Sequence, residues 1–211
     1  MNKADQEILV VDRATLFADS YFQGFCDAAS MDYRRIIDDN YFYLRRGDVE
    51  PNPAYKQPIP YVIIAQKESR LIFAYQRSST SSYSEKRLRG KWSWGIGGHV
   101  DKDESVTGDP ILAALHREIS EEIDLVNYEP PILLGYINDD QTEVGQVHFG
   151  LLFLAFTEAR KIKPKDKEMS WGGFMSYDQL AEICALSDGN VESWSEIALE
   201  PLRRALGFDQ E

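Results

Sequence analysis

The sequence is poor in features that would place it in several common classes of protein. It holds only two cysteines, Cys26 and Cys184, and no metal-binding spacing joins them. A disulfide-rich scaffold and a cysteine-ligated zinc site are therefore excluded, and free thiols in a reducing compartment are expected. Basic residues number 23 against 35 acidic ones, which gives a formal net charge of −12. Extended nucleic-acid or anionic-membrane surfaces require the opposite balance.

Long apolar runs are also missing. No stretch reaches the roughly 18 residues that cross a bilayer, and the first residues show no signal-peptide pattern. We therefore expect a cytoplasmic protein. What is present is ordinary globular material, with 43% hydrophobic and 12% aromatic residues in a chain of 211. That length suits one domain with an extension.

The first part of the chain differs in pattern from the rest. Residues 7–11 are strand-like, residues 19–38 show helical spacing of apolar side chains, and residues 41–44 form another apolar run. Four prolines then indicate a connection: Pro51, Pro53, Pro58 and Pro60. We expect residues 1–57 to be an N-terminal α/β extension packed on a domain of residues 58–211.

The second part alternates strands and helices. Two strands, residues 61–65 and 71–75, form a predicted hairpin, and a helix is predicted over roughly 110–123. A capping box at Ser176 starts a later helix, and a last amphipathic helix spans about 194–206. Further strands are predicted at 92–96, 132–137, 147–156 and 168–174. This order predicts an α/β fold.

An acidic cluster is the most informative local feature. Glu118, Glu121 and Glu122 stand at i, i+3 and i+4, so they share one face of the predicted helix, with Arg117 beside them. Carboxylates this close repel one another unless a cation lies among them. Mg²⁺ prefers oxygen ligands and commonly bridges carboxylates to phosphates. A glutamate-rich helix can also be an ordinary solvated surface, so the context decides.

The context is a strand, a glycine turn, an acidic loop and then the acidic helix. This segment resembles the signature of the Nudix hydrolase family, G-x5-E-x7-R-E-U-x-E-E-x-G-U, where U is a bulky aliphatic residue. The matching positions are Gly98, Glu104, Arg117, Glu118, Ile119, Glu121, Glu122 and Leu125.

Two departures from the signature have structural consequences. Twelve residues separate Glu104 from Arg117 where the family has seven, so five are inserted and the placement of Glu104 is left open. Asp109 and Pro110 then read as the N-cap and first residue of the helix. Asp124 replaces a glycine that ends the helix in a left-handed conformation, which we expect to carry a modest local cost.

The resemblance implies a Nudix-type α/β/α sandwich with a mixed sheet. It also implies Mg²⁺- or Mn²⁺-dependent hydrolysis of a phosphoric anhydride, by water attack at phosphorus. The substrate would be a small molecule, either a nucleoside diphosphate linked to another group or a related organic pyrophosphate, and a homodimer is compatible with the family. The implied metal ligands are the glutamates of the helix and a backbone carbonyl at or near Gly98. The implied catalytic residues are Arg117, which would orient a glutamate, and Glu104, Glu121 and Glu122, with the general base left open.

Candidates for substrate binding lie outside the motif. Arg77 ends a strand, Arg87 lies in a charged loop, His99 follows the glycine turn, and Glu143 lies in an acidic loop with Asp140. Each also has a simpler structural interpretation, as a solvated charge or a hydrogen-bonded structural histidine. Three tryptophans could stack a base, although core packing is the simpler interpretation: Trp92, Trp94 and Trp171.

Two other functions share this fold. One is a non-catalytic Nudix-like nucleotide sensor, although such proteins often carry an eroded signature and the signature glutamates are all present here. The other is an isopentenyl diphosphate isomerase, whose chemistry needs an active-site cysteine. Cys26 lies in the extension and Cys184 in a late helix, so neither has an obvious place in an active site. Hydrolysis is therefore the leading hypothesis.

Overall fold

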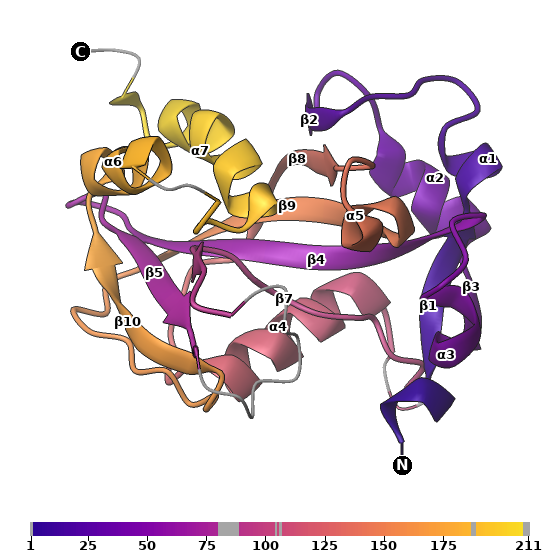
Figure 1. The fold of residues 1–211 in the computed structure, drawn as a ribbon, viewed down its shortest axis with the longest axis horizontal. Coiled ribbons are helices and arrows are strands. Elements are labelled where there is room, and N and C mark those ends of the chain that lie inside the picture. The colour runs from indigo at the N-terminus through magenta and orange to yellow at the C-terminus, as the bar shows by residue number, and fades with distance from the viewer. Residues whose placement is uncertain (1, 80–88, 104, 106, 187–188, 209–211) are drawn as a thin grey trace. The chain divides into compact units, whose positions relative to one another are not determined.

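A computed structural model describes residues 2–79, 89–103, 105, 107–186 and 189–208. Glu104 and Arg87, both predicted above to act in the site, lie outside the described residues. The helices and strands are labelled in Figure 1, and the chain divides into two compact units. The first unit comprises Met1–Tyr61, Gly97–His116 and Leu133–Leu152, and the second comprises Val62–Ile96, Arg117–Ile132 and Phe153–Glu211. In the part of the chain that the structure describes, no helix is long and apolar enough to cross a membrane.

The first unit contains the N-terminal elements, in the order η1 (Lys3–Asp5), β1 (Glu7–Asp12), α1 (Arg13–Leu16), β2 (Gly24–Asp27), α2 (Tyr33–Asn40), β3 (Phe42–Arg45) and α3 (Arg46–Val49). Strand β1 pairs antiparallel with β3, from Glu7 opposite Arg45 to Val10 opposite Phe42. A small core of Ile8, Val10 and Val49 lies under this pair. The strand predicted at residues 7–11 is therefore confirmed, and the apolar run at residues 41–44 belongs largely to strand β3.

The helix predicted over residues 19–38 is wrong in its first half. Residues 24–27 form β2, which pairs antiparallel with β8 (Ile132–Asn138). Gly24 has a φ of +88°, which interrupts any helix there. The helix begins only at Tyr33, where the side chain of Asp32 accepts a hydrogen bond from the Arg35 N–H. Pairing with a strand more than a hundred residues away overrode the local apolar spacing.

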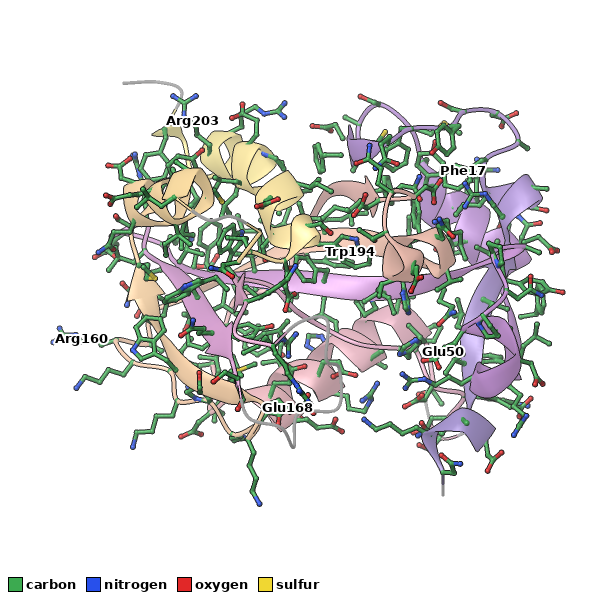
Figure 2. The ribbon with its side chains drawn as sticks, in the orientation of Figure 1. Phe17, Glu50, Arg160, Glu168, Trp194 and Arg203 are labelled. Atoms are coloured by element: carbon green, nitrogen blue, oxygen red, sulfur yellow. The ribbon has the colours of Figure 1, made fainter. Side chains whose placement is uncertain are left out.

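Aromatic side chains fill the interior around α1 and α2. Phe17, labelled in Figure 2, contacts the rings of Phe22, Tyr33 and Phe149 at centroid distances of 6.3, 6.0 and 5.9 Å. Tyr33 is fully buried and its hydroxyl donates to the Ser20 carbonyl. These contacts explain the aromatic content of residues 17–33, because the rings belong to a core.

The second unit is built on β5 (Ile72–Arg77). Strand β10 (Met169–Met175) flanks it on one side and β4 (Tyr55–Gln66) on the other. The predicted hairpin of β4 and β5 is confirmed, with Ala65 opposite Ile72. The short strand β6 (Trp92–Ser93) pairs antiparallel with β5 and also forms a parallel bridge to Val191. The α/β class with a mixed sheet is therefore confirmed.

Two helices follow β10 in the second unit, α6 (Tyr177–Leu186) and α7 (Ser193–Ala205). The predicted capping box opens α6. The Gln179 side chain accepts from the Ser176 N–H at 2.9 Å, and the Ser176 hydroxyl accepts from the Gln179 N–H at 3.3 Å. These reciprocal bonds satisfy two backbone donors that the first turn would otherwise leave unpaired.

The prolines near residue 58 do not mark a connection. Strand β4 begins at Tyr55 and continues through Pro58 and Pro60. Because the two prolines are two residues apart, their missing N–H groups fall on the same edge of the strand, and pairing at the other edge is unaffected. A Cβ added at Gly97, in β7 (Ile96–Gly97), would collide with the Pro60 carbonyl, so only glycine fits there.

The signature helix is α4 (Pro110–Glu122). Its predicted start is confirmed, because the Asp109 carboxylate accepts from the backbone N–H groups of Ile111 and Leu112 at 2.9 and 3.1 Å. Its predicted end is wrong. Among the described non-glycine residues only Arg70 has a positive φ, so Asp124 is not left-handed. The Asp124 N–H instead donates to the Lys163 carbonyl at 2.8 Å, which removes the expected cost.

Candidate active site

Arg117 organises the exposed side of the acidic face of α4. Its Nη1 lies 2.8 Å from Glu118 Oε1 and 3.3 Å from Glu121 Oε2. The side chain of Glu121 is 58% exposed, whereas that of Glu118 is only 12% exposed. This geometry agrees with the predicted orienting function of Arg117, because one guanidinium can hold two carboxylates in fixed positions.

Glu122 lies on the buried side of the same face. It is 9% exposed, and its Oε2 has no hydrogen-bond partner among the described residues. Burial raises the pKa of Glu122 to about 8. The positive charge of Arg77 opposes this rise, and the nearby carboxylates of Glu118, Asp166 and Glu192 add to it. A buried carboxylate without a donor is costly, so this oxygen is suited to a positively charged partner.

The donor set fits a divalent cation in part. Two neighbouring carboxylates, Glu118 and Glu122, supply the hard oxygen ligands that such an ion takes, and one oxygen is buried and unpaired. However, across its described residues the structure shows no group of three or more His, Cys, Asp or Glu side chains placed to hold a metal ion. Glu118 and Glu122 are thus the pair that fits, and their ligation, like that of Glu121 and Gly98, stays a prediction.

Arg77 ends β5, as predicted, but it is paired. Its Nε lies 2.8 Å from Glu192 Oε1, and its Cζ lies 5.0 Å from the centroid of the Tyr75 ring. Glu192 immediately precedes α7 and is 70 positions after Glu122. Sequence reasoning missed both Glu192 and Asp166. Neither lies in a motif, and the only local signal at Glu192 is an acidic residue just before a helix.

A short segment joins the end of α4 to the end of β5. The Glu122 carbonyl accepts from the backbone N–H groups of Lys165 and Asp166 at 2.8 and 3.3 Å. Met169 lies opposite Arg77 in the β10–β5 ladder. Next to this pair, the carbonyl of Glu168, which is labelled in Figure 2, accepts from the Ser78 N–H at 2.7 Å. Backbone bonds therefore bring Arg77 and Glu122 into one region of the second unit.

His99, after the glycine turn in the first unit, has side-chain partners. Its Nε2 lies 2.7 Å from Gln57 Oε1 and 3.2 Å from His148 Nε2. The His148 Nδ1 donates to the Val144 carbonyl at 2.7 Å, and burial lowers the pKa of His148 to about 4. His148 is therefore neutral with its proton on Nδ1, so its Nε2 can only accept, and the one proton on His99 Nε2 is shared between Gln57 Oε1 and His148 Nε2. These bonds agree with the structural interpretation of His99, and a substrate contact by His99 stays a prediction.

The acidic loop after β8 is mostly structural. Asp140 accepts from Lys56 at 2.8 Å and pairs with Arg13. Lys56 is fully buried and also donates to the Gly145 carbonyl at 2.6 Å. Glu143 starts a short helix, α5 (Glu143–Val147), and is exposed. Asp140 is thus committed to its cations, and Glu143 stays a prediction for substrate binding.

The three tryptophans separate into two environments. Trp94 is 1% exposed and belongs to the core, as expected. Trp171 is 44% exposed and meets Trp92 edge to face at 5.3 Å, so the core interpretation is wrong for Trp171. It lies in β10, the terminal strand of its sheet.

The two cysteines are free, as expected, and both are half-buried. Burial raises the pKa of both thiols, that of Cys184 to about 11. Cys26 lies in β2 and Cys184 in α6.

Comparison with known proteins resolves the family. A family model described as NUDIX domain matches residues 56–194. The chain belongs to the Nudix family. Protein YmaB of Bacillus subtilis (strain 168) is 33% identical over 211 residues, covering 96% of this chain and 100% of YmaB. The crystal structure of Tm1382, proposed to be a Nudix hydrolase, is 28% identical with a TM-score of 0.75, covering 95% of this chain and 100% of Tm1382.

More distant structures share the fold. The NUDIX domain of Shewanella oneidensis NrtR, complexed with ADP ribose, is 14% identical with a TM-score of 0.52, covering 72% of this chain and 88% of that domain. Family membership makes this Nudix chain a pyrophosphohydrolase, and hydrolases of the family generally use divalent metals. The comparisons do not favour the sensor or isomerase alternatives.

Proposed function

We propose that this Nudix enzyme hydrolyses a phosphoric anhydride in a nucleoside diphosphate linked to another group, or in a related organic pyrophosphate. The reaction would use Mg²⁺ or Mn²⁺, with water attacking phosphorus. The observation that carries the proposal is the buried Glu122 carboxylate, whose Oε2 is unpaired and which has Glu118 as its neighbour on the signature helix. Such an oxygen is costly to bury unless a cation completes it.

Glu118 and Glu122 would hold the cation, with the carbonyl at or near Gly98 as a further predicted ligand. When bound, the ion would neutralise phosphate charge and lower the pKa of an attacking water. Glu121 is the accessible motif glutamate, and Arg117 Nη1 lies 3.3 Å from its carboxylate. We therefore assign Glu121 as the general base that takes a proton from the attacking water. Glu104 keeps its predicted catalytic function as a second candidate for this step.

The substrate class has chemical support. The NrtR domain binds ADP ribose, which is a nucleoside diphosphate linked to a second sugar. Among the charged side chains, Arg77 has the largest effect on the pKa of Glu122. A guanidinium binds phosphate oxygens well, so Arg77 is a candidate for holding the substrate phosphates. Arg87, His99 and Glu143 are the other predicted contacts with the substrate.

The test is phosphate release, after coupled phosphatase treatment, from a panel of diphosphate compounds. The panel holds nucleoside triphosphates, nucleotide sugars, dinucleoside polyphosphates, ADP-ribose, NADH and coenzyme A, each with Mg²⁺, Mn²⁺ or chelator. We expect metal-dependent turnover of one class, lost in Glu122→Gln but kept in Glu129→Gln, a surface residue paired with Lys67. Full activity in Glu122→Gln, or turnover in chelator, would refute the proposal. Cation binding without turnover of any compound would favour a nucleotide sensor.

A further inference from the structure

The loop between Gly98 and helix α4 is anchored to strand β1 at its start. The Leu9 N–H donates to the Val100 carbonyl at 2.8 Å, and the Lys102 N–H donates to the Glu7 carbonyl at 2.9 Å. The Lys102 side chain adds an ion pair, because its Nζ lies 2.9 Å from Glu7 Oε2. The N-terminal extension therefore holds the chain directly after Gly98, the predicted source of a metal ligand.

The other end of this loop, Asp109, is anchored to helix α2. Arg34 Nη2 lies 2.7 Å from Asp109 Oδ2, whereas Asp109 Oδ1 accepts from the N–H groups of Ile111 and Leu112. The two oxygens of one carboxylate are thus divided between the N-terminal extension and the first turn of α4. The pair is partly shielded from water, since the side chains of Arg34 and Asp109 are 19% and 31% exposed. A charge-assisted bond of this kind is stronger than one between neutral groups.

Arg34 is itself held in place. Its Nε donates to both carboxylate oxygens of Asp38, one turn further along α2, at 2.9 Å. Its backbone N–H donates to the hydroxyl of Tyr136 in β8 at 2.9 Å, and Tyr136 is buried. A planar guanidinium on an anchored backbone and with one fixed partner has few orientations left. Arg34 is therefore suited to fix the position of Asp109.

The loop needs such an anchor more than a loop of the usual length, because it carries five inserted residues and a longer loop has more conformational freedom. We propose that Arg34 is a positioning residue for the metal site, which fixes Asp109 and with it the start of α4 relative to the chain after Gly98. This inference rests on the proposed function. Since α4 is one continuous helix, movement at its first turn is passed on to Glu118 and Glu122.

The test is calorimetric titration of the full chain with Mn²⁺, without substrate, on a double-variant cycle. Arg34→Met keeps the aliphatic stem and removes the guanidinium. Asp109→Asn keeps an oxygen for the helix cap and removes the charge that Arg34 pairs with. We expect each single variant to raise the Kd for Mn²⁺ about three- to fivefold. The double variant should be no weaker than the weaker of the two, because all three variants lack the same bond.

A spectroscopic readout separates positioning from a general loss of stability. At saturating Mn²⁺ the electron paramagnetic resonance spectrum of the bound ion depends on the arrangement of its ligands, so Arg34→Met should change the zero-field splitting. Arg35→Met is the matched control, because Arg35 is the next residue of α2, its side chain is 79% exposed and it lies 3.5 Å from Asp39. This control should leave both the Kd and the spectrum unchanged.

The outcomes separate this inference from the proposed function. If the wild type binds Mn²⁺ and Glu122→Gln does not, while Arg34→Met and Asp109→Asn match the wild type in Kd and spectrum, the inference is overturned and the hydrolase stands. If the two single effects add in the double variant, the residues act separately and the inference is again overturned. If the wild type itself binds no Mn²⁺, both fall. Should Arg34→Met fail to fold by circular dichroism, Asp109→Asn decides, and an unchanged Kd there overturns the inference.

Discussion

The Lys56–Asp140 pair allows a stability prediction that can be worked from the structure. Lys56 is fully buried, and its Nζ donates to Asp140 at 2.8 Å and to the carbonyls of Gly145 and His148 at 2.6 and 3.1 Å. Burial raises the pKa of Asp140, but hydrogen bonds from Arg13, Lys56 and Tyr21 outweigh burial and hold that pKa well below its usual range. Asp140 therefore stays ionised and neutralises a cation that cannot reach water.

The change Asp140→Asn keeps the shape of the side chain and removes its charge. Breaking a buried ion pair on one side costs about 3–5 kcal/mol, because the other charge stays buried alone. The Asp140 side chain is 16% exposed, which lets water screen part of the loss and favours the lower end, about 3 kcal/mol. For a chain of 211 residues this corresponds to a fall in Tm of about 6–12 °C.

The assay is urea unfolding at pH 7 followed by circular dichroism. Asp39→Asn is the control, because Asp39 forms a surface pair with Arg35 at 3.5 Å and is 64% exposed, and its loss should cost under about 0.5 kcal/mol. The double change Lys56→Met/Asp140→Asn should be more stable than Asp140→Asn alone, since the stranded charge is gone. If Asp140→Asn costs no more than the Asp39 control, the reasoning on this buried pair is refuted.

Three further predictions follow from the structure. The pKa of Asp140 is lower in the folded protein than its unfolded value of 3.8, so its contribution to the free energy of unfolding is complete above that pH and is lost below it. The urea midpoints of the wild type and Asp140→Asn should therefore converge between pH 4 and the lowest pH at which the protein folds. A constant gap between the two midpoints would contradict this. A Cβ at Gly145 would collide with the Asp139 carbonyl, so Gly145→Ala should destabilise the protein by about 1–3 kcal/mol in thermal unfolding, and a neutral result would show that the loop can shift. Burial raises the pKa of Cys184 to about 11, so at pH 7.5 iodoacetamide should alkylate Cys184 far more slowly in the native protein than in urea. Peptide mass spectrometry measures both rates, and equal rates would argue against a buried thiol.

The parts of the fold that could be predicted from the sequence depend on contacts close along the chain. The Asp109 cap, the Ser176–Gln179 capping box and the β4–β5 hairpin each join residues within about ten positions of one another, and all three are confirmed. The errors arose where a distant segment decides. Strand β2 exists because β8 pairs with it, and Asp124 avoids the left-handed conformation because the Lys163 carbonyl receives its N–H.

The candidate site divides along the same line. The motif places Glu118 and Glu122 one helical turn apart, so their proximity follows from the sequence alone. The motif does not specify which of its carboxylates is buried, or which other residues change the pKa of that carboxylate. The backbone N–H groups of Lys165 and Asp166 donate to the Glu122 carbonyl, and Arg77 pairs with Glu192 from a distant part of the chain.

This division has a physical cause. One helix can supply several metal ligands, because a cation needs oxygen atoms close together and residues three or four positions apart lie on one face of a helix. The charges that act on those oxygens, in contrast, come partly from other elements. Arg77 arrives on a strand and Glu192 before a helix, and neither position is constrained by the spacing of the glutamates. Arg77 and Glu192 therefore act on the charge of Glu122 although neither residue lies in the motif.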